Sequence, residues 1–209
     1  KSKVINNFNC KEKKLPDFKF HVDEFPSGIE AIEALDGQLI TNKIPVTPKI
    51  ENGCFVSDIK NDILKIVVIN RYKDLPMAKG FIKNFGLQKG AIASSVAHDS
   101  HNIIAVGADD ESLCKAVNLV IEKRGGVSCV NESEQYSKIL PLPVGGLMSN
   151  EDGYKVAEAY TEIDKAAKQL GSHLSAPFMT LSFMALLVIP HLKLSDLGLF
   201  DGDTFAFIN

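Results

Sequence analysis

Residues 62–72, "DILKIVVINRY", decide the fold that this sequence favours. The segment is rich in β-branched residues and almost continuously apolar between Ile63 and Ile69. Such a run is typical of a strand buried on both of its faces, as in the interior of a sheet covered by other elements. The sequence therefore predicts a sheet that has this strand in its interior.

The segments after this strand predict further strands and one helix. Residues 77–90 contain glycines near both ends and favour an irregular or short helical segment, whereas 91–97 and 102–107 favour strands. Residues 109–126 predict an amphipathic helix, capped by Asp109 or Asp110, and 127–130 predict another strand. The helix should end at the glycine pair and bury an apolar stripe made of Leu113, Ala116, Val117, Val120 and Ile121.

A second long helix is expected from about Glu151 to Leu170, capped by Ser149 or Asn150 and stopped by Gly171. Its apolar stripe consists of Val156, Ala159, Tyr160, Ile163, Ala167 and Leu170. Residues 177–190 form the most apolar segment, but 14 residues are too few to span a bilayer. This segment is expected to form a core helix or a pair of strands.

The chain divides by pattern into two parts. Residues 1–16 have the composition of a loose leader, and short runs broken by Pro, Gly and Asn follow up to residue 56. Three of those runs, 18–22, 37–46 and 54–59, favour short strands. Residues 57–209 alternate strands with helices, which predicts an α/β or α+β fold with a mixed sheet and flanking helices.

Composition excludes several classes of partner. The formal net charge is −3 and no basic run is present, so neither nucleic acid nor an anionic membrane is an expected partner. The four cysteines are scattered without a C-x-x-C pair, which disfavours a zinc knuckle and favours free thiols in a cytoplasmic protein. No signal peptide opens the chain, and the missing initiator Met hints at a piece of something longer.

The unusual feature is a polar run inside apolar sequence, "SSVAHDSHNIIAVG" at residues 94–107. On a strand, the side chains of His98 and His101 would point to opposite faces of the sheet. They could bind the same metal ion if they lay in a turn, and a third ligand would then have to come from another part of the chain. A serine nucleophile beside a histidine lacks a G-x-S-x-G elbow. A plain turn does not need two histidines. We therefore expect a binding or catalytic loop at strand ends, with candidates Ser94, Ser95, His98, Asp99, Ser100, His101 and Asn102.

Other candidate positions have simpler interpretations. Arg71 ends the strongest strand, either as an ion-paired structural residue or as an anchor for the polar loop. Residues 140–149, "LPLPVGGLMS", favour a rigid connection from strand to helix, and a loop for a small ligand is the alternative. His21, His173 and His191 stand alone and are expected to be structural or exposed.

Several segments resemble, in the same order, the C-terminal region of bacterial and archaeal adenine deaminases. The likeness runs from about residue 29 to the end of the chain. The segments that carry it are "ALDGQLITNKI", "DILKIVVINRY", "GFIKNFGLQKGAIA", "GAIASSVAHDSHNIIAVG", "LPLPVGGLMS" and "PFMTLSFMALLVIPHLKLSDLGL".

This resemblance implies a function. Members of the family belong to the amidohydrolase superfamily and hydrolyse adenine to hypoxanthine and ammonia in purine salvage, with a divalent metal, manganese or iron, held in a (β/α) barrel. This chain has no H-x-H motif for such a centre, so no metal is expected on it alone and the chain alone should be inactive. Residues 1–56 would be a leader and part of a small β-sandwich, and 57–209 the family's C-terminal α/β domain.

The resemblance also assigns roles to residues. His98, Asp99 and His101 would be catalytic, and Ser94, Ser95, Ser100, Asn102 and Arg71 would bind adenine at a site closed against the missing barrel. The whole protein is expected to be a cytoplasmic homodimer. The family commonly has Glu-Arg-His where this chain has Asn70-Arg71-Tyr72. That departure keeps open an alternative: a stand-alone, non-catalytic module that binds a purine or serves as a partner subunit.

Overall fold

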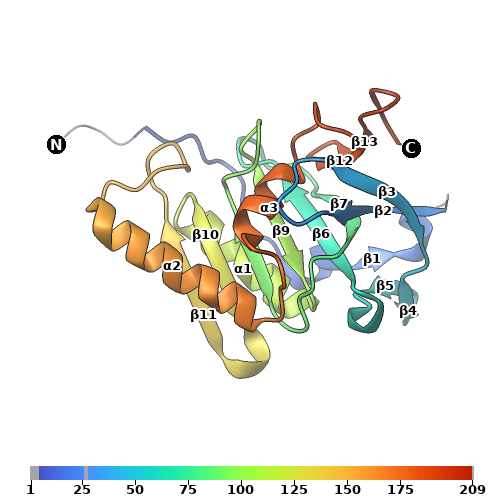
Figure 1. Cartoon of the computed structure of the whole chain (residues 1–209), viewed down its shortest axis with the longest axis horizontal. Helices are drawn as coiled ribbons and strands as arrows, with labels where there is room; N and C mark the ends of the chain where they lie inside the picture. The colour runs from blue at the N-terminus through green and yellow to red at the C-terminus, as the bar shows by residue number, and fades with distance from the viewer. Residues whose placement is uncertain (1–4, 26–27, 209) are drawn as a thin grey trace.

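An eight-stranded mixed sheet forms the centre of the computed structural model, which describes residues 5–25 and 28–208 (Figure 1). Its strand order is β11-β10-β8-β9-β6-β7-β2-β3, and only β2 and β7 pair in parallel. The strands are β2 (Ile29–Ala34), β3 (Thr41–Val46), β6 (Ile63–Ile69), β7 (Ala78–Lys83), β8 (Ala91–Ser94), β9 (Ile103–Gly107), β10 (Gly126–Asn131) and β11 (Tyr136–Pro141). The predicted mixed sheet is confirmed.

Strand β6 is buried on both faces, as its sequence predicts. All seven of its residues are buried. Val67 and Ile69 pack in the cluster that contains α1 (Asp110–Glu122), whereas Ile66 and Val68 pack in the cluster that contains α2 (Gly153–Gln169) and α3 (Pro177–Phe183). In Figure 1 the helices α2 and α3 lie in front of the sheet and α1 lies behind it. The predicted flanking helices therefore cover both faces.

The two long helices lie close to their predicted positions. The Asp109 carboxylate accepts a hydrogen bond from the Ser112 amide at 2.7 Å and caps α1. Helix α2 begins at Gly153 and is capped by Asp152, so the expectation of a cap at Ser149 or Asn150 was wrong. The apolar segment 177–190 contributes the short core helix α3.

Strand β7 corrects one prediction, because residues 77–90 contain a central strand and no helix. Two lysines and Gly80 interrupt the strand pattern in its sequence. The strand is nevertheless paired on both edges, with β6 and with β2. A Cβ at Gly80 would lie 3.5–3.6 Å from Leu199, Ile66 and Leu194, so the glycine sits in a well-packed position. Pairing on two edges outweighs the weak local preference of these residues.

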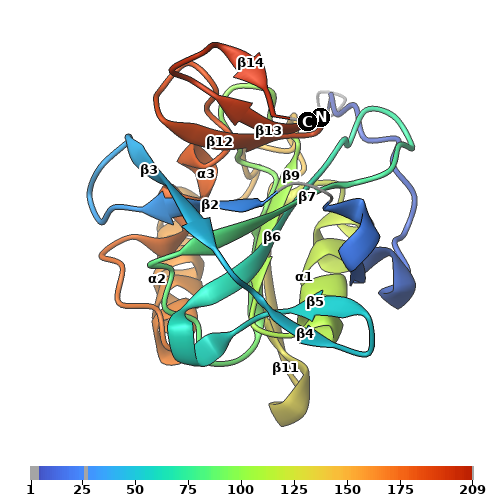
Figure 2. The ribbon, with the colours of Figure 1, turned by 90° about the vertical axis from the view of Figure 1, so that its right-hand side faces the viewer.

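Two small antiparallel sheets flank the large one. One contains β1 (Phe20–His21), β5 (Cys54–Val56) and β4 (Lys49–Glu51), and the other contains β12 (Leu192–Ser195), β13 (Gly198–Asp201) and β14 (Ala206–Phe207). Figure 2 shows β12–β14 at the top and β4 and β5 towards the bottom. Short 3₁₀ turns occupy Leu15–Phe18, Val22–Glu24, Ile59–Asn61 and Glu132–Glu134.

The large sheet takes strands from both sides of the predicted boundary between residues 56 and 57. Strands β2 and β3 precede that boundary and pair with each other and with β7. The first four residues of the predicted leader lie outside the described residues. All four cysteines are free thiols.

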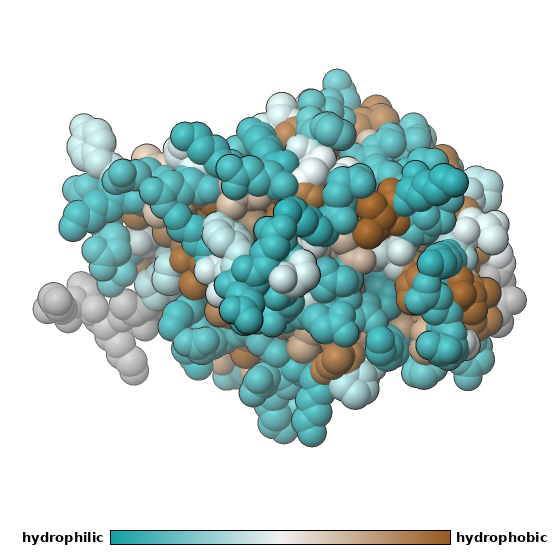
Figure 3. Space-filling model, turned by 90° about the horizontal axis from the view of Figure 1, so that it is seen from below, coloured by the Kyte–Doolittle hydropathy of each residue, from teal (hydrophilic) through white to brown (hydrophobic). Residues whose placement is uncertain are grey.

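The face of the molecule seen from below is mainly hydrophilic, with small separate hydrophobic patches (Figure 3). Within residues 5–25 and 28–208, no helix has both the length and the hydropathy needed to cross a bilayer.

Two lysines are buried in this fold and differ in their partners. The Lys65 ammonium lies 2.7 Å from the Asp110 carboxylate and donates to the Phe18 carbonyl at 3.1 Å. The Lys193 ammonium donates to the Leu39 carbonyl at 2.7 Å, and no described carboxylate lies within ion-pair distance of it. Burial lowers the pKa of Lys193 to about 8.

Replacing Lys193 by Met should therefore stabilise the protein at pH 7. Below pH 8 the folded protein holds a buried ammonium at a cost of about 3 kcal/mol. Between pH 8 and 10.5 the unfolded chain binds more protons at this position, so the free energy of unfolding of the parent protein rises with pH. Urea unfolding should show a larger free energy of unfolding for the variant than for the parent at pH 7. This difference should be smaller at pH 10. A variant less stable than the parent by the same amount at both pH values would contradict this.

Candidate functional site

The polar loop, residues 95–102, connects the antiparallel neighbours β8 and β9 at one end of the sheet. Three of the hydrogen bonds that hold its main chain are between backbone groups. The amides of Ser95, His98 and His101 donate to the carbonyls of Gly126 (3.0 Å), Ser182 (3.0 Å) and Ala97 (2.6 Å). The expected loop at strand ends is therefore present and is fixed by bonds to β10 and α3.

Two imidazoles lie together on this loop. The ring centroids of His98 and His101 are 5.7 Å apart, with the rings steeply inclined at 69°. His98 also stacks on Phe183 of α3, with centroids 4.9 Å apart. The Nδ1 atom of His101 is buried and has no hydrogen-bond partner. Asp99 and Ser100 are exposed at the tip of the loop.

The surroundings of His101 keep its ring uncharged at neutral pH. Burial is the main cause that lowers its pKa. The neighbouring His98 and Arg71 also lower this pKa, whereas Asp99 raises it. A neutral imidazole offers one donor and one acceptor of hydrogen bonds. The loop thus holds a neutral, partly exposed imidazole whose Nδ1 atom is buried in this chain, so contact with a heterocycle or proton transfer would fall to its other ring nitrogen.

The end of β6 supports the loop from the side. The Arg71 amide donates to the Asn102 side chain at 3.2 Å, and the Asn102 amide group donates to the Ser100 hydroxyl at 3.2 Å. The Tyr72 hydroxyl donates to the Ser100 carbonyl at 2.7 Å and accepts from the Arg71 guanidinium at 3.0 Å. Sequence reasoning missed Tyr72 as a support, although its place beside Arg71 at a strand end was the available signal.

Arg71 acts as an anchor for this loop. Its side chain is 4% exposed, between the rings of Phe8 and Tyr72, and it forms no ion pair with any described carboxylate. The Nε and Nη1 atoms are buried without a hydrogen-bond partner. Of the two interpretations from the sequence, the ion pair is absent among the described residues, and the Arg71 side chain reaches the loop through the Tyr72 hydroxyl, which bonds to Ser100.

The two serines before the loop tie it to neighbouring segments. The Ser94 hydroxyl accepts from the Val96 amide at 3.0 Å. The Ser95 hydroxyl donates to the Gly146 carbonyl at 2.6 Å and accepts from the Gly126 amide at 2.9 Å. Residues 140–149 are thereby bonded to the polar loop. The burial and bonding of Ser95 favour a supporting role for it, as they do for Asn102 and Arg71.

The residues of this chain do not fit a divalent metal centre. His98 and His101 supply two imidazoles, and no group of three His, Cys, Asp or Glu side chains suited to a metal ion occurs among the residues that the structure describes. A metal centre with fewer than three protein ligands would be unusual.

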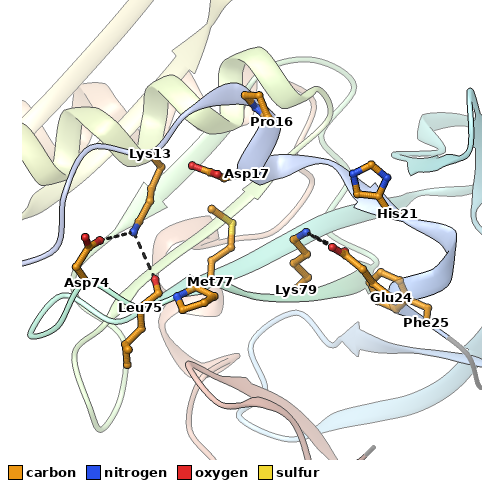
Figure 4. Close-up of a pocket in the computed structure, with 11 residues that line it drawn as sticks. Lys13, Pro16, Asp17, His21, Glu24, Phe25, Asp74, Leu75, Met77 and Lys79 are labelled. Atoms are coloured by element: carbon orange, nitrogen blue, oxygen red, sulfur yellow. Dashed lines mark hydrogen bonds and ion pairs between the residues drawn. The ribbon is translucent and has the colours of Figure 1, made fainter.

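One cavity of about 730 Å³ lies away from the loop, between the N-terminal segment and the residues that precede β7 (Figure 4). Its charged side chains pair with one another. The Lys13 ammonium lies 3.1 Å from the Asp74 carboxylate, and Lys79 lies 2.8 Å from Glu24. These pairs neutralise four of the five lysine, aspartate and glutamate side chains that line the cavity, and the fifth, Asp17, accepts a hydrogen bond from the Lys14 amide, so the cavity is a weak candidate.

A second cavity, of about 450 Å³, touches the loop. It lies between α2 and α3, and we call it the α2–α3 groove. Its lining is mainly apolar and includes Ser94 and Val96. Ser94, one of the predicted site residues, therefore also lines this cavity.

The packing of Arg71 against Gly146 gives a stability prediction. Gly145 and Gly146 both have positive φ, at +64° and +75°, but a Cβ at Gly146 would lie 1.9 Å from Arg71 Nη1, whereas a Cβ at Gly145 meets nothing within 4 Å. Gly145→Ala should cost about 1–2 kcal/mol through backbone strain alone. Gly146→Ala should cost a further ~1–3 kcal/mol from overpacking against a buried side chain. Chemical unfolding measures the free energy of unfolding of both variants. Equal losses of stability would show that the Arg71 side chain moves aside to admit the extra methyl group.

The comparisons with known proteins agree on one family. Residues 38–206 match the family described as adenine deaminase C-terminal domain. An adenine deaminase of Borreliella burgdorferi is 48% identical over 207 residues, which are 98% of this chain and 37% of that protein. An adenine deaminase of Methanosarcina barkeri is 56% identical over 180 residues, or 86% of this chain and 32% of that protein.

A more distant relative agrees. An adenine deaminase of Methanothermobacter thermautotrophicus is 43% identical over 208 residues, covering 94% of this chain and 38% of that protein. The chain thus spans about a third of the length of the curated relatives that it matches. It belongs to the adenine deaminase C-terminal domain family.

Proposed function

We propose that this chain is the C-terminal part of an adenine deaminase, which converts adenine and water to hypoxanthine and ammonia. Its polar loop would help to close the purine site against the preceding part of the full-length protein. The relatives that bear this name and extend well beyond the matched region support the proposal. The observation that carries it is the pair of imidazoles held together on the loop at the end of the sheet.

The chemistry of the loop suits adenine. The base presents ring nitrogens that accept hydrogen bonds and an exocyclic amine that donates them. In the reaction the bond from C6 to the amine breaks, a bond from C6 to the oxygen of water forms, and a proton must reach the leaving nitrogen. His98 and His101 could bond the ring or carry that proton, with the exposed Asp99 beside them. Ser100 and Ser94 would add hydroxyl contacts, while Arg71, Ser95, Asn102 and Tyr72 hold the loop in place.

The remaining parts of the proposal concern the whole protein. A divalent ion, manganese or iron, would be held by the preceding part, and when bound it would activate the attacking water. The described residues of this chain offer no set of three ligands for it. We further propose a role in purine salvage, a cytoplasmic location and a homodimeric assembly for the full-length enzyme.

Substituting either histidine tests the loop's role in the full-length protein. His98→Ala and His101→Ala should each lower kcat/KM for adenine by about 10²–10⁴-fold if the ring transfers a proton, while the metal content stays unchanged. His191→Ala is the matched control, because His191 pairs with Asp203 at the small sheet of β12–β14 and should leave the activity intact. Unchanged kinetics in both loop variants would refute the proposed role.

The isolated 209 residues should not deaminate adenine, since they offer no metal centre among the described residues. Ammonia release measured with added manganese or iron checks this. Turnover by the isolated chain would contradict the proposal. Tight adenine binding without turnover, in a mature protein that starts at Lys1, would instead favour the alternative of a stand-alone purine-binding module.

A further inference from the structure

The α2–α3 groove is lined mainly by apolar residues. The two helices that border it lie on one face of the sheet (Figure 1). No charged residue lines the groove. Its walls are built mainly by Leu142, Leu147, Val156, Tyr160, Phe178 and Met179. A ligand or partner held by charge is therefore excluded, and an occupant of this groove must be apolar itself.

Apolar side chains stand exposed in and around this groove. Met179, which lines it, is 51% exposed, and Tyr154, at the start of α2, is 88% exposed. Met148, next to the lining residue Leu147, is 59% exposed. Three exposed apolar side chains thus lie at or next to the groove, and a partner that covered them would gain hydrophobic stabilisation.

The groove is continuous with the polar loop. Ser94 and Val96 line it, and both lie at the start of the loop. Ser182 also lines it, and the Ser182 carbonyl accepts the hydrogen bond from the His98 amide at 3.0 Å. An occupant of the groove thus lies next to the α3 residue that bonds the main chain of the loop, although neither histidine lines the groove itself.

The N-terminal segment enters the fold beside the same groove. The Gly145 amide donates to the Ile5 carbonyl at 2.8 Å, and the Asn6 side chain donates to the Pro143 carbonyl at 3.0 Å. Residues 143–145 lie between Leu142 and Leu147, which line the groove. Ile5 and Asn6 therefore lie next to this surface, and a segment tethered to the chain at this point would have a raised effective concentration at the groove.

We propose that an apolar segment from the preceding part of the full-length protein fills the α2–α3 groove and so sets that part against the polar loop. The inference rests on the proposed function, in that the chain must be one part of a longer protein. The Borreliella burgdorferi relative has 63% of its length outside the matched region (100% minus 37%), which is ample to supply such a segment. Burial of the exposed methionine and tyrosine side chains would stabilise the contact through the hydrophobic effect.

A matched pair of tyrosines tests this in the full-length protein. Tyr160 lines the groove and is 37% exposed, whereas Tyr136 begins β11 outside it and is 36% exposed. Without an occupant the two rings should react with hydroxyl radicals at similar rates. With the groove filled, Tyr160 should be labelled several-fold more slowly than Tyr136. Equal labelling would overturn the proposal, and protection that disappears on dilution would overturn it in favour of a second copy of the chain.

One variant and its control sharpen the result. Met179→Lys, at an exposed position in the groove, should restore the labelling of Tyr160, whereas Leu197→Lys, at a 71% exposed position between β12 and β13, should not. Adenine turnover measured on the same preparations separates the two proposals. If the protein turns over adenine but Tyr160 and Tyr136 are labelled equally, the proposed function stands and the proposal about the groove is wrong. If Tyr160 is protected but adenine is not turned over, the groove is filled as proposed and the proposed function is wrong.

Discussion

Burial of β6 on both faces is the constraint on which the rest of the structure depends. A strand without an exposed residue must be covered by helices on each side, and α1 on one face and α2 with α3 on the other meet that need. Lys65 lies in this strand, and a carboxylate partner offsets the cost of burying its ammonium. Asp110, the first residue of α1, is that partner, so the charge fixes where the helix starts over the sheet. Removing one member of a buried pair costs about 3–5 kcal/mol, which makes this contact a strong positional restraint.

The same strand builds the candidate site through its register. Ile69 of β6 lies opposite Ile103 of β9, so the residues that follow β6 meet the residues that precede β9. Arg71 therefore reaches Asn102 and Tyr72 reaches Ser100, although the segments are about thirty residues apart in the chain. The two histidines are held from one side by this contact and from the other by α3, through Phe183 and Ser182. A rigid frame thus carries a polar loop whose tip stays exposed.

The sequence predicted the local features well and the long-range ones poorly. Strand β6 and helix α1 have strong patterns of burial and capping, and both lie where their patterns place them. Strand β7 was missed because Gly80 and its lysines weaken the local signal, while its stability comes from pairing on two edges. For the site, the polar loop was evident from its composition. The supporting role of Tyr72 was not, because it depends on a strand register that local sequence does not encode.

The central claim is that the loop of residues 95–102 forms one wall of a purine site shared with the preceding part of the protein. The most direct measurement is a crystal structure of the full-length protein with hypoxanthine or a non-hydrolysable adenine analogue bound. The account predicts that the His98 or His101 ring lies within hydrogen-bond distance of the purine, at about 2.7–3.2 Å. A purine bound elsewhere, with both histidines facing solvent, would contradict it.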